Sequence, residues 1–121
     1  MTKLQDMHRM SWIEAKFLER ALTTLKDCRK TLMYTYAFAF YLKKTNQCII
    51  FEDNQNNLED STEKLSHYLE QELDINPQSD VAQIKAHVVN KQRFCESRRQ
   101  VLINHVHEGY EKGQWEYQDE N

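Results

Sequence analysis

The spacing of apolar residues in the first third of the chain predicts a long helix. Apolar side chains recur there about every 3.5 residues, at Leu18, Leu22, Leu25, Leu32 and Tyr36, with Trp12, Phe17, Met33 and Phe40 beside them. Such a repeat is typical of helices that pack lengthwise at shallow angles. Arg29 occupies the position that the repeat skips. We therefore predict a helix over residues 11–44 that starts at a capping box of Ser11 and Glu14. The aromatic stretch TLMYTYAFAFYL at its end is expected to be mainly core.

Two further segments show a helical pattern. The second is predicted over residues 48–73, where the inner positions are Phe51, Gln55, Leu58, Thr62, Leu65, Leu69 and Leu73. The third is predicted over residues 80–112, with an inner face of Val81, Ile84, Val88, Cys95, Leu102 and either His105 or Val106, interrupted by Lys91 and Arg98. The break before the second segment contains Lys43 and Lys44, which suit a helix C-terminus because its dipole favours cations. Pro77 marks the loop before the third.

These patterns predict an all-α fold. Three long helices with short connections form an antiparallel bundle with coiled-coil-like packing, and 121 residues fit one helical domain over residues 1–121. Two Gly and one Pro argue against a turn-rich β fold. Gly109 and Gly113 are expected to loosen the end of the third helix. Trp115 and Tyr117 form an aromatic C-terminal tail, which we expect to fold back on the bundle or to dock on a neighbour.

Charge and cysteine usage exclude several classes of partner. The formal net charge is -3 and the basic residues are scattered, which weighs against nucleic-acid binding. No apolar run approaches the roughly 18 residues of a membrane span, and no signal peptide is recognisable. Cys28, Cys48 and Cys95 lack zinc-ligand or disulfide spacing. We expect them to pack as small hydrophobic residues in a reducing compartment. The predicted location is cytoplasmic, with the nucleus as a second site.

The sequence does not encode a catalytic centre that we recognise. A di-metal helical bundle requires Glu-x-x-His pairs, and none occurs. Glu63 and His67 are four residues apart and are expected to form a surface pair, whereas His105 and His107 point to different helix faces. Neither a glycine-rich phosphate loop nor a nucleophile motif is present. We therefore predict no catalytic residue, no metal site and no cofactor in this segment.

A stretch of twelve residues inside the second predicted helix, residues 52–63, is rich in acidic and amide side chains. These side chains belong to Glu52, Asp53, Asn54, Gln55, Asn56, Asn57, Glu59, Asp60 and Glu63. One interpretation is a solvated helix face. The other is a docking face, because Asn and Gln are mediocre helix formers and Lys or Ala would serve better on a surface that needs only to be soluble. Glu52 and Glu63 are eleven residues apart, close to three helical turns, so both lie on one side of the helix.

Three long blocks carry a family resemblance: MSWIEAKFLERAL, LMYTYAFAFYLKKTNQCIIFEDNQNNLEDSTEKLSHYLE and CESRRQVLINHVHEGYEKGQWEY. Together they resemble the C-terminal Ariadne domain of Ariadne-1-type RING-between-RING ubiquitin ligases. The likeness covers nearly the whole chain, and the loop at residues 74–80 and the final QDEN match least.

The resemblance implies a regulatory role. In this family a second RING carries a catalytic cysteine, the Ariadne domain covers it, and a neddylated cullin-RING ligase releases the block. Zinc is then expected in the RING modules of the parent protein rather than in this segment. The inhibitory acids of the family match Glu52 in IIFEDNQ and Glu63 in STEKL. A further Phe-Glu pair of the family precedes SWIE and lies outside this chain.

A structural role is the alternative hypothesis. A spectrin-repeat-like scaffold module has the same length and the same heptad pattern. A tandem array of similar units in the parent protein would favour that alternative, whereas neighbouring Cys/His-rich zinc modules would favour the ligase.

Overall fold

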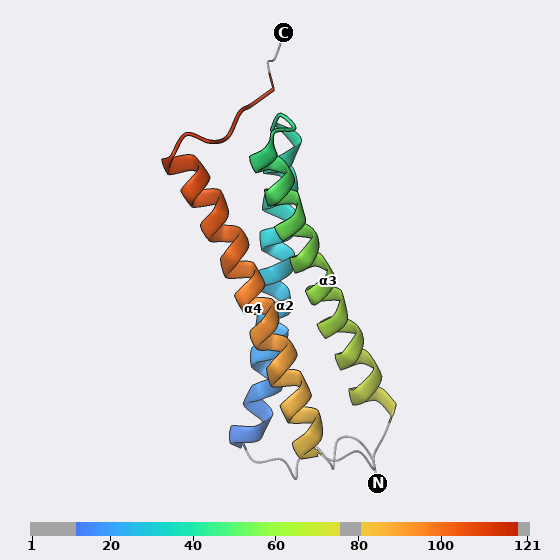
Figure 1. Cartoon of the computed structure of the whole chain (residues 1–121). Coiled ribbons are helices and arrows are strands. Elements are labelled where there is room, and N and C mark those ends of the chain that lie inside the picture. Colours follow the sequence, from blue (N-terminus) through green and yellow to red (C-terminus); the bar gives the residue numbers. More distant parts are fainter. Residues whose placement is uncertain (1–11, 76–80, 119–121) are drawn as a thin grey trace.

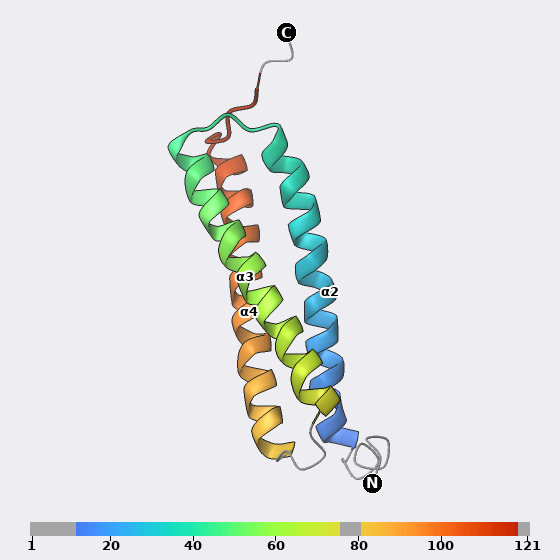
Figure 2. The ribbon, with the colours of Figure 1, turned by 90° about the vertical axis from the view of Figure 1, so that its right-hand side faces the viewer.

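A computed structural model describes residues 12–75 and 81–118 of the chain and contains three long helices within them. These are α2 (Trp12–Phe40), α3 (Asn46–Ile75) and α4 (Val81–Glu111). Successive helices run in opposite directions along one rod (Figure 1), and the view turned by 90° shows α2 beside α3 with α4 behind them (Figure 2). The predicted all-α antiparallel bundle is therefore confirmed.

The helix boundaries differ from the prediction mainly at the end of α2. This helix ends at Phe40 rather than at residue 44, so the prediction that Lys43 and Lys44 close it was wrong. α3 begins at Asn46, because the Thr45 hydroxyl caps it by accepting a hydrogen bond from the Cys48 amide at 3.2 Å. The sequence pattern did not identify Thr45 as a cap. Ser11, the predicted cap of α2, lies outside the described residues.

The core of α2 is displaced by one position from the predicted row. The prediction placed Leu22, Met33, Tyr36 and Phe40 inward, but their side chains are 44–73% exposed, and Tyr34 and Tyr41 in the aromatic stretch are exposed as well. Phe17, Leu18, Leu25 and Leu32 are buried as expected. The buried row with 4-3-4-3-4 spacing consists of Phe17, Ala21, Thr24, Cys28, Thr31 and Thr35.

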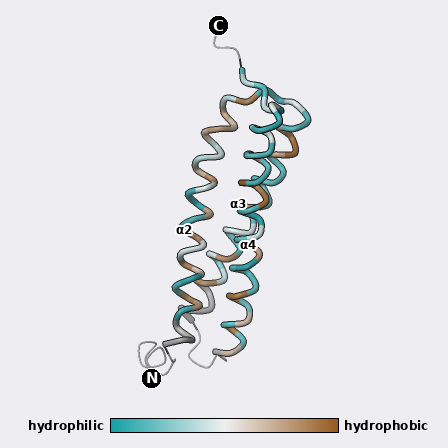
Figure 3. Tube along the Cα trace, turned by 90° about the vertical axis from the view of Figure 1, so that its left-hand side faces the viewer, coloured by the Kyte–Doolittle hydropathy of each residue, from teal (hydrophilic) through white to brown (hydrophobic). Residues whose placement is uncertain are grey.

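The predicted inner rows of α3 and α4 are largely confirmed. In α3 the buried positions are Phe51, Gln55, Leu58, Thr62, Leu65 and Leu69; the side chain of Leu73 lies outside the described part. In α4 the buried positions are Ile84, Val88, Cys95 and Leu102, joined by Gln92, while His105 and Val106 are half-buried. Coloured by hydropathy, each helix alternates between apolar and polar positions along its length (Figure 3).

Polar side chains inside the bundle find partners on neighbouring helices. Gln92 donates to the Thr24 hydroxyl at 2.9 Å, and Gln55 donates to the Thr35 hydroxyl at 3.0 Å. These bonds explain why threonines occupy core positions of α2, since a buried polar group is costly unless it is hydrogen-bonded. They also tie each of α3 and α4 to α2 at a defined register.

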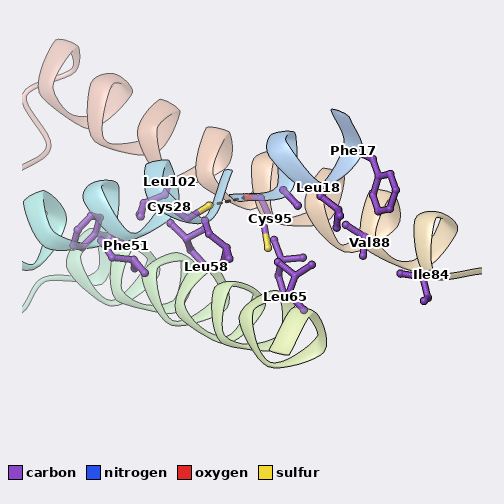
Figure 4. Packing of buried hydrophobic residues seen from close by; sticks show 14 of the residues in the cluster. Phe17, Leu18, Cys28, Phe51, Leu58, Leu65, Ile84, Val88, Cys95 and Leu102 are labelled. Atoms are coloured by element: carbon purple, nitrogen blue, oxygen red, sulfur yellow. Dashed lines mark hydrogen bonds between the residues drawn. The ribbon is translucent and has the colours of Figure 1, made fainter. Parts of the chain in front are cut away.

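Arginine and cysteine side chains make further contacts between the helices in the middle of the bundle. Arg99 donates to the Thr31 hydroxyl at 3.0 Å, whereas its neighbour Arg98 lies over the ring of Phe94. Cys28 and Cys95 lie between the helices (Figure 4), and the Cys95 thiol donates to the Ser61 carbonyl at 3.1 Å. Hydrogen bonding to Cys28 and burial raise the pKa of Cys95.

Candidate protein-interaction site

The acidic and amide cluster divides into core and surface residues. Gln55 is buried and belongs to the core through its bond to Thr35, so it is not available to a partner. Glu52, Asn56, Glu59 and Glu63 follow a 4-3-4 spacing, which places them along one edge of α3. This acid edge contains both acids that the family resemblance singled out.

Glu52 and Glu63 differ in their surroundings. The Glu52 side chain is partly buried and forms an ion pair with Lys44. It also accepts a hydrogen bond from the Cys48 thiol at 3.4 Å. The hydrogen bond from Lys44 lowers the pKa of Glu52, so this carboxylate stays charged at neutral pH. Glu63 is exposed about 16 Å further along the helix. The sequence pattern did not predict the pairing with Lys44, which comes from the loop.

The acid edge is linked directly to α2. The Tyr36 hydroxyl donates to Glu59 at 2.5 Å, and Arg29 donates to the Ser66 hydroxyl at 3.0 Å. Burial and the hydrogen bond to Glu59 raise the pKa of Tyr36 to about 12. Both bonds cross the surface between α2 and α3. The acid edge therefore lies on the side of α3 that faces the exposed surface of α2.

The C-terminal tail folds back on the bundle, which confirms one of the two expected outcomes. Trp115 is only 7% exposed, and its indole Nε1 donates to the Val106 carbonyl at 2.9 Å. Its ring packs edge-on against Phe38, Phe51 and His105. The tail forms an antiparallel bridge between Tyr117 and Leu42, and it passes across the end of the bundle that holds the α2–α3 loop (Figure 2).

The two glycines order the end of α4, contrary to the expectation that they loosen it. Gly113 adopts a left-handed φ of 66°. The amides of Gly113 and Gln114 then bond to the carbonyls of Tyr110 and Gly109, the pattern of a Schellman cap. A Cβ atom at Gly109 would collide with the ring of Trp115, so the absence of a side chain there makes room for the tail.

Among residues 12–75 and 81–118, no group of three His, Cys, Asp or Glu side chains is placed to hold a metal ion. Nor does any helix in these two ranges have the length and apolarity needed to cross a membrane.

The fold defines the class of protein: an all-α bundle of antiparallel helices, one of which carries the acid edge. More specifically, the chain belongs to the Ariadne domain family, whose family model matches residues 2–106. It is 58% identical over 117 residues to the E3 ubiquitin-protein ligase ARIH1 of Homo sapiens, covering 95% of this chain and 20% of that protein.

Other relatives show the same relationship. The chain is 55% identical over 117 residues to the E3 ubiquitin-protein ligase ariadne-1 of Drosophila melanogaster, covering 95% of this chain and 23% of the relative. It is 46% identical over 119 residues to the E3 ubiquitin-protein ligase ari-1.1 of Caenorhabditis elegans, covering 98% and 23%. The chain spans about a fifth of the length of the curated relatives it matches.

Proposed function

We propose that this domain is the regulatory domain of a RING-between-RING ubiquitin ligase, which covers the catalytic second RING until a neddylated cullin-RING ligase releases it. Membership of the Ariadne domain family and similarity to E3 ubiquitin-protein ligases support this proposal over a spectrin-like scaffold. The single observation that carries it is the acid edge of α3, on which Glu52 and Glu63 are presented together.

The bundle suits a reversible lock. Its helices are tied together by buried hydrogen bonds, so docking of a partner on the acid edge orders few additional groups and costs little conformational entropy. Inhibition requires only that the closed state be favoured by a few kcal/mol, and an activator must then prefer the open state by more than that amount. Carboxylates that remain hydrated in the open state fit such a balance better than a large apolar interface.

The two acids would contribute differently. Glu63 is free to bind the second RING directly, whereas Glu52 is already engaged with Lys44. Glu52 therefore acts either as a ligand of the second RING or as an anchor for the α2–α3 loop. We further propose that the ligase resides in the cytoplasm or nucleus, that its zinc ions belong to the RING modules, and that this domain binds neither nucleic acid nor membranes.

The test is ubiquitin discharge by the full-length ligase in the absence of neddylated cullin. Glu52→Ala combined with Glu63→Ala is expected to accelerate discharge, and Glu111→Ala, an exposed acid on α4, serves as the matched control. Lys44→Ala separates the two roles of Glu52: it mimics Glu52→Ala if Glu52 is an anchor and leaves inhibition intact if Glu52 is a ligand. Unchanged discharge in the double variant would remove these two residues from the inhibitory contact.

A further inference from the structure

The C-terminal tail pairs with the loop that joins α2 to α3. The Lys43 amide donates to the Glu116 carbonyl at 2.8 Å, and the Gln118 amide donates to the Tyr41 carbonyl at 2.8 Å. The Gln118 side chain adds a hydrogen bond to the Leu42 carbonyl at 3.2 Å. The tail therefore holds the loop through its main chain, so the path of the loop depends on the tail being in place.

The same loop sets the start of α3. The Thr45 amide donates to the Lys43 carbonyl at 2.9 Å, and the Thr45 hydroxyl caps α3 by accepting a hydrogen bond from the Cys48 amide. The Cys48 thiol in turn donates to Glu52 at 3.4 Å, and Lys44 forms an ion pair with the same carboxylate. Lys43 thus bonds to the tail through its amide and to the α3 cap through its carbonyl. A continuous series of contacts leads from the tail to Glu52.

The ion pair between Lys44 and Glu52 benefits from a fixed loop. The Lys44 side chain is 72% exposed, and an exposed ion pair contributes little because two long side chains must be held in one geometry at a cost in conformational entropy. A loop whose main chain is already fixed lowers that cost. Trp115 keeps the tail itself in place, since its ring is buried against Phe38 and Phe51.

We propose that residues 116–118 position Glu52 for the inhibitory contact by acting through the α2–α3 loop. This inference rests on the proposed function, because the tail has this task only if Glu52 contributes to inhibition. It holds whether Glu52 binds the second RING or anchors the loop, since the tail fixes the loop and the α3 cap in both cases. Glu63 lies about 16 Å further along α3, beyond the series of contacts described above, so its contribution should not depend on the tail.

The experiment compares two truncations of the full-length ligase by ubiquitin discharge without neddylated cullin. Removal of the chain from residue 116 onward abolishes the pairing but leaves Trp115 in place. Removal from residue 119 onward leaves the pairing intact and serves as the matched control. We expect the first truncation to raise the discharge rate to that of the Glu52→Ala variant, and the second to leave the rate unchanged.

A double-mutant cycle shows whether the tail acts through Glu52. In a Glu52→Ala background, removal from residue 116 onward should change the discharge rate by a factor of about 1. In a Glu63→Ala background, the same truncation should keep its full effect. A purely structural role, in which loss of the tail destabilises the whole bundle, would accelerate discharge in both backgrounds.

Point substitutions at Gln118 provide a milder change for the case in which the truncated protein does not fold. Gln118→Pro removes the amide that donates to the Tyr41 carbonyl, whereas Gln118→Ala keeps this amide and loses only the side-chain bond. We expect Gln118→Pro to act like the truncation and Gln118→Ala to retain inhibition. In the full-length ligase, Gln118→Pro should increase deuterium exchange at residues 41–45 and leave exchange at residues 92–102 of α4 unchanged, which shows that the bundle is folded.

The possible results separate this inference from the proposed function. Unchanged discharge after removal from residue 116 onward, with faster discharge in the Glu52→Ala, Glu63→Ala double variant, would overturn the inference and leave the proposed function standing. Faster exchange at residues 41–45 without faster discharge would overturn it as well, because the tail would then hold the loop without positioning Glu52. Equal acceleration in the Glu52→Ala background would show that the tail acts by another route. If the double variant itself discharges at the wild-type rate, the proposed function fails and this inference fails with it.

Discussion

Gly109→Ala tests how the C-terminal tail packs on the bundle. We expect this substitution to lower the free energy of unfolding, whereas a Gly-to-Ala change inside a helix usually raises it. In a helix interior this substitution normally stabilises by about 1 kcal/mol, since Ala has the higher helix propensity. Here the new methyl group would lie within 2.6 Å of the Trp115 Cζ2 atom. Trp115 must then leave its place between Phe38, Phe51 and His105 and lose its bond to the Val106 carbonyl.

The size of the effect follows from what Trp115 loses. Complete loss of a buried Trp side chain costs about 3–5 kcal/mol, and the gain in helix propensity offsets about 1 kcal/mol of that. We expect Gly109→Ala to lower the free energy of unfolding by about 2–4 kcal/mol. For a chain of this length that corresponds to a decrease in Tm of about 8–16 °C, measurable by circular dichroism during heating and in urea.

A double-mutant cycle isolates the cause. In a Trp115→Ala background the obstruction is gone, so Gly109→Ala should stabilise the protein by about 1 kcal/mol. Tyr110→Ala, a change at a 75% exposed residue of the same helix end, should alter stability by less than about 0.5 kcal/mol. If Gly109→Ala stabilises the wild-type protein, Trp115 does not pack on Gly109 and our description of the tail is wrong.

Three further predictions concern the core, the α2–α3 loop and pH. Thr24→Val removes the acceptor for the Gln92 amide and should lower the free energy of unfolding by about 1–3 kcal/mol. Thr24→Val combined with Gln92→Leu should recover most of the lost stability, and no recovery in denaturant unfolding would refute the buried bond. Thr45→Ala should cost about 1 kcal/mol through loss of the α3 cap, while Thr45→Ser retains it; equal losses would argue against capping. Burial lowers the pKa of His105, with the nearby Glu108 opposing the shift. Because the unfolded chain then binds this proton more readily, stability should fall as the pH drops below about 6.5. His105→Leu should remove that part of the pH dependence in unfolding curves measured between pH 5 and 7, values chosen to bracket the unfolded pKa, and an unchanged slope would contradict it.

Local pattern predicted the helices well and the register of α2 poorly. In α3 the core row consists mainly of Phe and Leu, so apolar spacing alone identified it. In α2 the true row contains Thr24, Thr31 and Thr35, which are buried because Gln92, Arg99 and Gln55 hydrogen-bond to them. Those partners are 20 to 68 residues away in sequence, beyond the range of any helical periodicity. Apolar spacing therefore favoured the larger side chains of Leu22, Met33, Tyr36 and Phe40 as core residues, although these four are exposed.

The candidate site shows the same limit. The helical spacing placed Glu52 and Glu63 on one side of α3, but it gave no indication that Glu52 pairs with Lys44, because that lysine lies in the loop outside the helical repeat. The aromatic character of Trp115 and Tyr117 predicted that the tail either folds back on the bundle or docks on a neighbour, and the structure shows the first outcome. The role of Gly109 could not be predicted, since it depends on a close approach between residues that are brought together by the cap at Gly113.

Deletion of this domain tests the proposed inhibition most directly. The measurement is the rate at which the catalytic cysteine of the second RING accepts ubiquitin from a charged conjugating enzyme, in a single turnover and without neddylated cullin. We predict that the full-length ligase lacking residues 12–118 of this chain forms the ubiquitin thioester faster than the intact ligase does. An unchanged or slower rate would contradict the claim that the domain covers the catalytic cysteine.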